Sequence, residues 1–398
     1  MQAVILGGGK GTRLATTGPK PLVEVGGKPF LRYLLAELRR FGIVDIVVLT
    51  GPFADAYRAR LGDGSQFGVR LTYVAEPDPA GTGGALTYAA RHLAPEFLLL
   101  NGDSFFDINL VDLMTRTFSP GWLIGLALRE VEDVARYGAV GLDGDKITAF
   151  GEKAVAGPGI INAGIYRLRR EAVAELGPPP VSLEKDTLPR LVARGQVRGV
   201  VYPGRFIDIG VPDDLARART LMPSWERRPA AFLDRDGVLN RDHGYVHKSE
   251  DFEWLPGARE AVKRLNDAGY LAIVVSNQAG IARGLYATED VEKLHRWING
   301  ELAKTGAHMD AFYYCPHHPT EGIGKYRRVC DCRKPAPGML LHAIREWPIE
   351  SPASFMIGDK DIDMQAAAAA GIRGIHFSGG NLDALIGAIL ASQARRGQ

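Results

Sequence analysis

One local pattern recurs along this 398-residue chain: a short apolar run ends at glycine or aspartate, and a longer segment with helical periodicity follows. This alternation predicts α/β domains built on mostly parallel sheets. In the N-terminal half we expect strands at 3–6, 43–49, 71–75, 97–100 and 197–202, and helices at 30–40, 85–93 and 183–193. In the C-terminal half we expect strands at 230–233, 271–276 and 354–357, and helices at 257–268, 288–302 and 364–370. The fold class is therefore α/β, with two doubly wound domains.

A polar, proline-flanked segment without periodicity separates the two halves, from Met222 to Pro229. Such a segment is typical of a domain boundary. We place a linker at 223–229, between domains covering 1–222 and 230–398. The length of the chain also favours about two domains over one.

Composition excludes several classes of protein. The chain is 46% hydrophobic and 24% charged with a net charge of +2, so bulk charge favours neither nucleic acid nor membrane as a partner. We expect no membrane span and no secretory leader, because a strand follows Met1 directly. The three cysteines lie between Cys315 and Cys332 and do not form a disulfide framework, which favours a reducing cytoplasm. The oligomeric state stays open, a homo-oligomer included.

A glycine-rich loop follows the first expected strand, with glycines at positions 7, 8, 9 and 11. Glycines let backbone N–H groups approach a phosphate closely. Arg13 and Lys20 add positive charge beside that loop. The loop lacks the Gly-Lys-Thr/Ser ending of a kinase-type loop and the spacing of a dinucleotide site. We predict a phosphate-binding loop, and a plain tight turn is the alternative.

Two aspartates end apolar runs in this half, Asp103 after residues 98–102 and Asp208 after Phe206-Ile207. The carboxyl ends of strands in an open α/β sheet face the ligand crevice. The two carboxylates are therefore candidates to hold one Mg²⁺ against triphosphate oxygens, and turn capping is the alternative.

Residues 1 to about 220 resemble the sugar-phosphate nucleotidyltransferases, and most of all their D-glycero-D-manno-heptose 1-phosphate guanylyltransferase branch. The resemblance rests on residues 8–14 with 19–21, on Glu76 with 81–86, and on 101–103, 208–210, 152–153 and 162–164. It implies a Rossmann-like domain that couples a sugar 1-phosphate to a nucleotide, with GTP as the expected donor and Mg²⁺ as cofactor. The catalytic residues that it implies are Arg13 and Lys20. The implied substrate-binding residues are Gly8, Gly9, Gly11, Thr12, Glu76, Gly81, Thr82, Gly83, Glu152, Lys153 and Asn162.

The C-terminal half carries chemistry of a different kind. Asp234 and Asp236 lie two residues apart after the expected strand at 230–233. A carboxylate is ionised at neutral pH and attacks phosphorus without a base, while a second carboxyl group protonates the leaving alkoxide. The pair predicts a phosphatase that works through an aspartyl-phosphate.

Three further residues follow apolar runs in the order that such a site requires. Ser276 offers a hydroxyl to phosphate, Lys334 neutralises the transferring group, and Asp359 completes a Mg²⁺ site with Asp234. For Asp363 we favour a capping or supporting role in the following helix.

The three cysteines and a histidine form a separate cluster, in which Cys315 and His317 precede Cys330 and Cys332. Three thiolates and one imidazole without an open position suit a structural Zn²⁺. His318 is an alternative ligand. Lys334 comes two residues after Cys332, so this metal would fix the loop that delivers the lysine.

Residues 230 to about 378 resemble the haloacid dehalogenase superfamily, and more narrowly its D-glycero-D-manno-heptose 1,7-bisphosphate phosphatases. The resemblance rests on 234–238, 242–247, 276–284 and 330–335. It favours His317 over His318 as the zinc ligand and implies Mg²⁺ at Asp234, Asp236 and Asp359. The substrate-binding residues that it implies are Asp242, His243, Gly244, Tyr245, Ser276, Asn277, Gln278, Ala279, Arg333, Lys334 and Lys360. For His243 and His247, plain surface histidines are the alternative.

Together the two halves predict a bifunctional enzyme that acts on small molecules. The second domain would convert heptose 1,7-bisphosphate into the 1-phosphate, and the first would couple that product to a nucleotide, with GMP from GTP as the expectation. Two alternatives stay open at this point. The same chemistries could serve other substrates, such as a hexose 1-phosphate or histidinol phosphate, or one domain could be a degenerate binding module.

Overall fold

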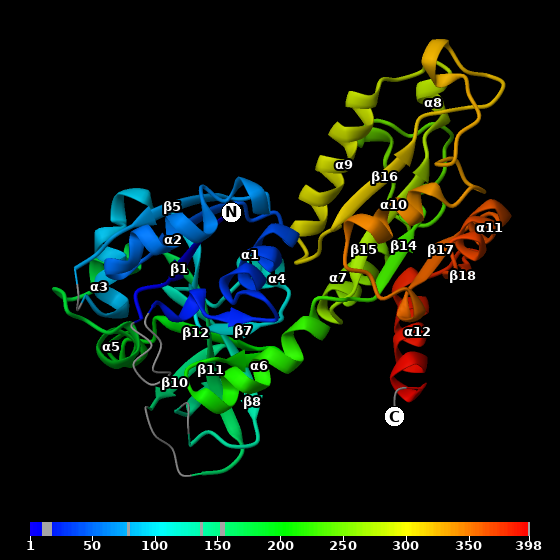
Figure 1. The fold of residues 1–398 in the computed structure, drawn as a ribbon. Helices are drawn as coiled ribbons and strands as arrows, with labels where there is room; N and C mark the ends of the chain where they lie inside the picture. Colours follow the sequence, from blue (N-terminus) through cyan, green and yellow to red (C-terminus); the bar gives the residue numbers. More distant parts are fainter. Residues whose placement is uncertain (10–17, 78–79, 136–137, 152–155, 397–398) are drawn as a thin grey trace. The chain divides into compact units, whose positions relative to one another are not determined.

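The computed structural model describes residues 1–9, 18–77, 80–135, 138–151 and 156–396 (Figure 1). The chain divides into two compact units, Met1–Trp225 and Glu226–Gln398. The first unit ends with helix α6 (Pro212–Trp225), so Pro223, Ser224 and Trp225 are helical although we expected a linker from residue 223. No helix in the described ranges is long and apolar enough to cross a bilayer.

The first unit is built on a nine-stranded sheet. In sheet order, the strands are β5 (Arg70–Val74), β4 (Asp45–Leu49), β1 (Gln2–Leu6), β6 (Glu96–Asn101), β11 (Gly159–Arg169), β8 (Ile124–Val131), β12 (Val197–Val201), β10 (Lys146–Phe150) and β9 (Val140–Asp143). Strands β5, β4, β1 and β6 run parallel, as expected, whereas β11 is antiparallel to both β6 and β8. The sheet is therefore mixed, because the second half of the unit contributes antiparallel strands that the sequence pattern did not reveal.

Helices cover this sheet, and two of them differ from expectation. The remaining helices of the unit include α1 (Leu31–Arg40), α2 (Ala54–Leu61), α3 (Gly81–Tyr88), α4 (Leu110–Thr115) and α5 (Leu188–Ala193). Helix α3 begins at Gly81, four residues before the expected start, so the Gly-Thr-Gly-Gly segment forms its first turn. The expected helix at 183–193 is a π-helical turn, Leu183–Thr187, followed by α5. Leu86 of α3 and Leu188 of α5 pack in one core with strand residues such as Val4 and Leu99.

A separate two-stranded sheet of the first unit carries one predicted metal ligand. Strand β7 (Ser104–Phe106) pairs antiparallel with β13 (Phe206–Asp208), and Ser104 is directly opposite Asp208. Because β7 follows β6 after a short turn through Asp103, the pairing places the two candidate metal carboxylates on neighbouring segments.

The second unit has a five-stranded sheet in which every pair of neighbours is parallel. In sheet order, the strands are β16 (Ala311–Cys315), β15 (Leu271–Asn277), β14 (Ala230–Leu233), β17 (Phe355–Gly358) and β18 (Arg373–His376). Alternate residues of β14 enter opposite cores, Ala231 and Leu233 on one face, Ala230 and Phe232 on the other. The sheet is thus buried on both faces, as expected for a doubly wound domain.

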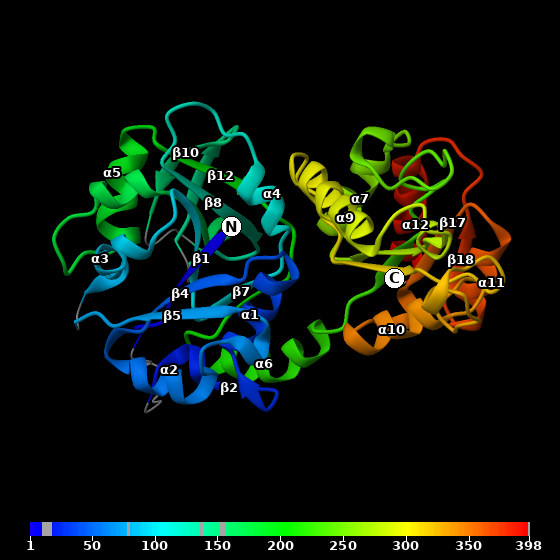
Figure 2. The same cartoon turned by 90° about the horizontal axis from the view of Figure 1, so that it is seen from above.

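Helices cover both faces of this sheet, as Figure 2 shows. The first face packs against α7 (Ala258–Asp267), α9 (Thr288–Ala303) and α12 (Leu382–Arg396). The second packs against α10 (Gly338–Glu346) and α11 (Asp361–Ala369). A short helix, α8 (Ala279–Ala282), follows β15. The predicted α/β class is confirmed in both units.

Candidate active sites

A cavity of about 820 Å³ opens in the first unit at the carboxyl ends of β1 and β6. Predicted site residues that line it are Gly8, Gly9, Lys20, Glu76, Gly81, Thr82, Asp103, Asn162 and Asp208. Gly83 does not line the cavity, because its amide N–H donates to the Val181 carbonyl in the packing of α3. Gly11, Thr12, Arg13, Glu152 and Lys153 lie outside the described residues. The structure thus brings segments from five parts of the sequence to one hollow.

The predicted metal carboxylates line this cavity together with Lys20. Lys20 Nζ is 2.9 Å from Asp103 Oδ2. The Ser104 hydroxyl donates to Asp208 Oδ2 at 2.8 Å, and the Gly210 amide donates to Asp208 Oδ1 at 2.6 Å. Burial, and then the neighbouring Asp103 carboxylate, raise the pKa of Asp208 above its ordinary value. Two carboxylates that disfavour each other's charge fit a divalent cation, which would relieve that repulsion.

Glu76 reaches the same cavity from the segment after β5, and it is almost fully buried. Burial raises its pKa to about 7, against the opposing effect of a hydrogen bond from the Gly51 backbone. Its Oε2 atom is buried without a hydrogen-bond partner among the described residues. A buried, unpartnered carboxylate oxygen is costly, so Glu76 is prepared to accept hydrogen bonds from a ligand.

The cavity also contains a hydrogen-bonded group that sequence reasoning missed. The Thr82 hydroxyl donates to Glu184 Oε2 at 2.6 Å, and the Tyr166 hydroxyl donates to Glu184 Oε1 at 3.1 Å. Asn162 Nδ2 donates to the Tyr166 oxygen at 2.7 Å. Glu184, in the π-helical turn, therefore links the predicted base segment to the predicted sugar segment. Because Glu184 lies in a segment that we expected to be an ordinary helix, its position in the sequence did not indicate this role.

In the second unit, three aspartates and a lysine meet at the carboxyl ends of β14 and β17. Ligand oxygens of Asp234, Asp359 and Asp363 all lie within 4.8 Å of one another. Lys334 Nζ is 2.9 Å from Asp234 Oδ1 and 2.6 Å from Asp363 Oδ1. Burial raises the pKa of Asp234, and the Lys334 ammonium opposes that shift. Asp359 Oδ1 is buried without a hydrogen-bond partner in the described part of the chain, and such a carboxylate oxygen suits a divalent cation as its ligand.

Asp363 combines two roles. Its Oδ2 accepts a hydrogen bond from the Lys360 amide at 3.1 Å and so caps α11, as we expected. The same fully buried side chain also joins the carboxylate group, which we did not expect. Gly237 is required nearby, because it has φ +90° and a Cβ there would overlap the Asp359 carboxylate.

Asp236 does not join the carboxylate group, although we predicted it among the metal ligands. Its side chain turns toward Arg235, whose Nη2 lies 3.0 and 2.9 Å from the two carboxylate oxygens. Asn240 Nδ2 donates to Oδ1 at 2.9 Å, and Gln278 Nε2 donates to Oδ2 at 3.2 Å. Held in this way, the Asp236 carboxylate lies outside the group formed by Asp234, Asp359 and Asp363.

Some of the other residues predicted to bind substrate lie on an exposed loop, and others form hydrogen bonds within the protein. Lys360 pairs with Asp242 at 3.0 Å, and His243 pairs with Glu253 at 3.2 Å on the exposed loop that also carries Gly244 and Tyr245. Asn277, in contrast, exchanges two hydrogen bonds with the backbone of Lys334, each 3.0 Å long. Asn277 therefore fixes the lysine loop.

The remaining residues predicted to bind substrate in the second unit lie near β15 and the cysteine cluster. Arg333 donates to the His317 carbonyl at 3.1 Å. Ser276 and Gln278 are buried at the end of β15, and Ala279 begins α8. The contact of Arg333 ties the lysine loop to the cysteine cluster.

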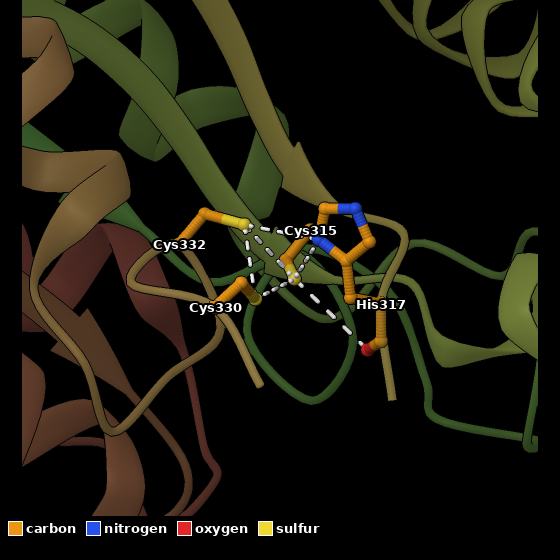
Figure 3. A group of neighbouring side chains, drawn as sticks. All are labelled: Cys315, His317, Cys330 and Cys332. Carbon is orange, nitrogen blue, oxygen red and sulfur yellow. Dashed lines mark hydrogen bonds between the residues drawn. The ribbon is translucent and has the colours of Figure 1, made fainter. Parts of the chain in front are cut away.

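The cysteine cluster is assembled as the sequence predicted. Cys315, His317, Cys330 and Cys332 point toward one common centre (Figure 3). The sulfur–sulfur separations are 3.3 to 3.6 Å, and His317 Nδ1 is 3.7 and 3.4 Å from Cys315 and Cys332. Tetrahedral zinc ligands lie roughly 3.5–3.8 Å apart. His318 instead accepts a hydrogen bond from the Glu321 amide at 2.9 Å.

Comparisons with known proteins agree with both halves of this picture. A family model described as nucleotidyl transferase matches residues 2–224, and one described as HAD-hydrolase-like matches residues 331–388. The D-glycero-beta-D-manno-heptose-1,7-bisphosphate 7-phosphatase of Rhodopseudomonas palustris is 45% identical over 42% of this chain and 94% of its own length. The same enzyme of Photorhabdus laumondii is 53% identical over 36% of this chain and 77% of its own. The crystal structure of HddC from Yersinia pseudotuberculosis complexed with GMP-PN is 31% identical, covers 56% of this chain and 99% of its own, and has a TM-score of 0.50.

The folds and the two sites define a nucleotidyltransferase followed by a phosphatase of the haloacid dehalogenase type. The chain belongs to the nucleotidyl transferase family through its first unit and to the family of these heptose bisphosphate phosphatases through its second. It is a bifunctional enzyme.

Proposed function

We propose that this enzyme makes a nucleotide-activated heptose in two steps. The second unit hydrolyses D-glycero-D-manno-heptose 1,7-bisphosphate to the 1-phosphate, and the first unit couples the 1-phosphate to GMP from GTP. The observation that carries the proposal is that one chain holds both a phosphatase akin to heptose bisphosphate phosphatases and a nucleotidyltransferase akin to HddC. The product of the first reaction is the substrate of the second, so the two activities belong in one sequence of reactions.

The phosphatase step uses residues that the geometry brings together. Asp234 attacks the phosphorus of the 7-phosphate, the bond from phosphorus to the sugar oxygen breaks, and Asp236 gives its proton to that oxygen. Asp236 then takes a proton from water, which attacks the aspartyl-phosphate and restores Asp234. Lys334 offsets the negative charge of the transferring group from its position 2.9 Å from Asp234. The Ser276 hydroxyl holds the phosphate.

In the transferase step an oxygen of the sugar 1-phosphate attacks the α-phosphorus of the nucleotide. The bond to the β-phosphate oxygen breaks, and pyrophosphate leaves. The backbone at Gly8 and Gly9 approaches the phosphates, and Lys20 offsets their charge. Asn162 and Lys185 line the cavity where the sugar phosphate would lie.

Magnesium fits both sites by the chemistry of the donors. Asp103 and Asp208 would hold it in the first unit, and Asp234, Asp359 and Asp363 would hold it in the second. When bound, it supplies positive charge to phosphate oxygens. The cysteine cluster fits zinc instead, because its donors are thiolates and an imidazole with no open position. Thiolate ligands also favour a cytoplasmic enzyme.

The zinc assignment predicts a stable metal content. We expect about one zinc per chain after dialysis, measured by atomic emission. Cys330→Ser should lose this zinc and lower phosphatase activity by roughly 10-fold or more, because Cys332 is two residues from Lys334 and the loop would lose its anchor. Coupling by the first unit serves as the control and should not change. A zinc-free protein with full phosphatase activity would refute the assignment.

Guanine is supported by Glu76. Its Oε2 atom, which has no hydrogen-bond partner among the described residues, can accept hydrogen bonds from the adjacent N1–H and 2-amino groups of guanine, a donor pair that uracil, thymine and cytosine lack. Glu76→Gln should lower kcat/KM for GTP by about 10- to 100-fold, the scale of hydrogen bonds to a charged group. Inosine triphosphate lacks the 2-amino group and provides the matched control. The wild type should prefer GTP to it, and the variant should lose that preference. Equal preference in both proteins would place base recognition elsewhere.

The proposed function is tested by giving the enzyme heptose 1,7-bisphosphate with each nucleoside triphosphate in turn and identifying products by mass spectrometry. We expect GDP-heptose, inorganic phosphate and pyrophosphate. A hexose 1-phosphate or histidinol phosphate that is turned over faster would replace the proposed substrates and leave the two reaction types intact.

A further inference from the structure

A buried polar network lies behind the phosphatase carboxylates and consists of Arg235, Gln278 and Tyr286. Arg235 is fully buried although it is charged. Beyond its contacts with Asp236, its Nη2 donates to the Val246 carbonyl and lies 3.4 Å from Gln278 Oε1. Val246 belongs to the loop that presents Asp242 and Tyr245. The guanidinium therefore joins the proton-exchanging carboxylate to the predicted substrate loop.

Gln278 has one amide orientation that satisfies its neighbours. Its Nε2 lies 3.2 Å from Asp236 Oδ2 and 2.8 Å from Ser276 Oγ, while its Oε1 lies 2.8 Å from the Tyr286 hydroxyl. In its ionised form the Asp236 carboxylate accepts hydrogen bonds and cannot donate them, so the amide nitrogen faces Asp236 in that form. The amide oxygen then has to face Tyr286, which donates to it. We predicted that Gln278 binds substrate. In the structure its side-chain amide makes hydrogen bonds within the network, and the residue is 1% exposed.

Tyr286 is held firmly for this contact. It is 8% exposed, and the His247 ring stacks on it with centroids 4.6 Å apart. Burial raises the pKa of Tyr286 to about 12, so its hydroxyl keeps its proton and remains a donor. Gly280 leaves room for the ring, since a Cβ at this position would overlap the ring and the hydroxyl. The site thus accommodates a large side chain whose hydroxyl donates to Gln278.

We propose that Tyr286 is a positioning residue of the phosphatase: through Gln278 it keeps Asp236 turned away from the Asp234–Asp359–Asp363 group and aimed to exchange protons with the leaving oxygen and with water. Without the hydroxyl, the Gln278 oxygen keeps only the longer contact of 3.4 Å with Arg235 Nη2, so the amide that donates to Asp236 is held less firmly. Asp236 keeps its hydrogen bonds with Arg235 and Asn240, but its orientation toward the leaving oxygen is less precise. The proposal rests on the proposed phosphatase function. It assigns a role to Tyr286, which acts on Asp236 through Gln278.

Substrates with different leaving groups distinguish a positioning role of Tyr286 from a merely structural one. Asp236 gives a proton to the departing oxygen, which a sugar alkoxide needs and a nitrophenolate does not, because nitrophenolate is a stable anion near neutral pH. Tyr286→Phe should therefore lower kcat for the sugar bisphosphate by about 10-fold, part of the roughly 10²–10⁴-fold that general acid–base catalysis supplies. The first-turnover release of nitrophenolate from nitrophenyl phosphate, followed by rapid mixing at saturating substrate, should stay within about twofold of the wild type.

Tyr270→Phe is the matched control. Tyr270 is also 8% exposed, and its hydroxyl donates to Gln393 beyond the opposite end of β15. It should leave both rates unchanged, and its Tm should fall about as much as that of Tyr286→Phe. The proposal is overturned if Tyr286→Phe lowers both rates equally or lowers neither. If the wild type fails on the heptose substrate but cleaves another alkyl phosphate, the proposed substrate is wrong, and the same comparison with that ester still tests the role of Tyr286.

Discussion

Asp234→Asn is expected to abolish phosphate release, with a loss of at least about 10³-fold, because an amide cannot form the aspartyl-phosphate. The same protein should couple sugar 1-phosphate to nucleotide at near the wild-type rate, because Asp234 belongs to a unit with its own cores. The measurements are inorganic phosphate release from the bisphosphate and pyrophosphate release from sugar 1-phosphate plus GTP.

The control for this result is Asp251→Asn, the same change at an exposed position of the second unit. It should leave both rates unchanged. If Asp234→Asn instead removes both activities from a protein with a wild-type circular dichroism spectrum, the assignment of one reaction to each unit is wrong.

The second large effect is expected in the first unit, at the Asp103 and Asp208 carboxylates that line the cavity. Asp103→Asn and Asp208→Asn should each lower coupling by at least ~100-fold, the scale of losing one main electrostatic stabiliser. Without both charges the site holds magnesium poorly, and the nucleotide phosphates meet the sugar phosphate with less positive charge between them. Asparagine keeps the size of the side chain, and at Asp208 it keeps an oxygen that accepts from the Gly210 amide or the Ser104 hydroxyl.

Pyrophosphate release across a magnesium titration checks this prediction. The activity that remains should require more magnesium than the wild type does, and phosphatase turnover should stay constant. Asp143→Asn, at the exposed end of β9, is the matched control. Wild-type coupling in both variants would place the metal elsewhere in the cavity.

Strands that precede the motifs could be predicted from sequence, because short apolar runs bounded by glycine and aspartate leave little choice. Strand β14 has the expected bounds, Ala230–Leu233. Strand β11 was missed, because its Asn162-Ala163-Gly164 segment resembles a loop and its register shifts between Asn162 and Ile165. Strand β18 (Arg373–His376) was missed because it is short and mostly exposed at the sheet edge. Strands without a continuous apolar run leave too weak a pattern.

Within the sites, the location of a residue was easier to predict than the direction of its side chain. The carboxyl ends of parallel strands share one edge, so Asp234 and Asp359 had to meet there. Spacing could not reveal that Asp236 turns to Arg235 while Asp363 joins the carboxylates, since both outcomes depend on partners distant in sequence, such as Gln278 and Lys334. Glu184 was missed for the same reason, because its partners Thr82 and Tyr166 come from separate elements.

The division of the chain at Trp225 and Glu226 has a consequence for how the cell controls these reactions. Each translated chain contributes one copy of each catalytic centre, so gene expression cannot change the ratio of the two. Whether the sugar monophosphate accumulates is then decided by the rate constants and affinities of the centres themselves. Selection for balanced flux therefore acts on side chains within each unit rather than on promoters.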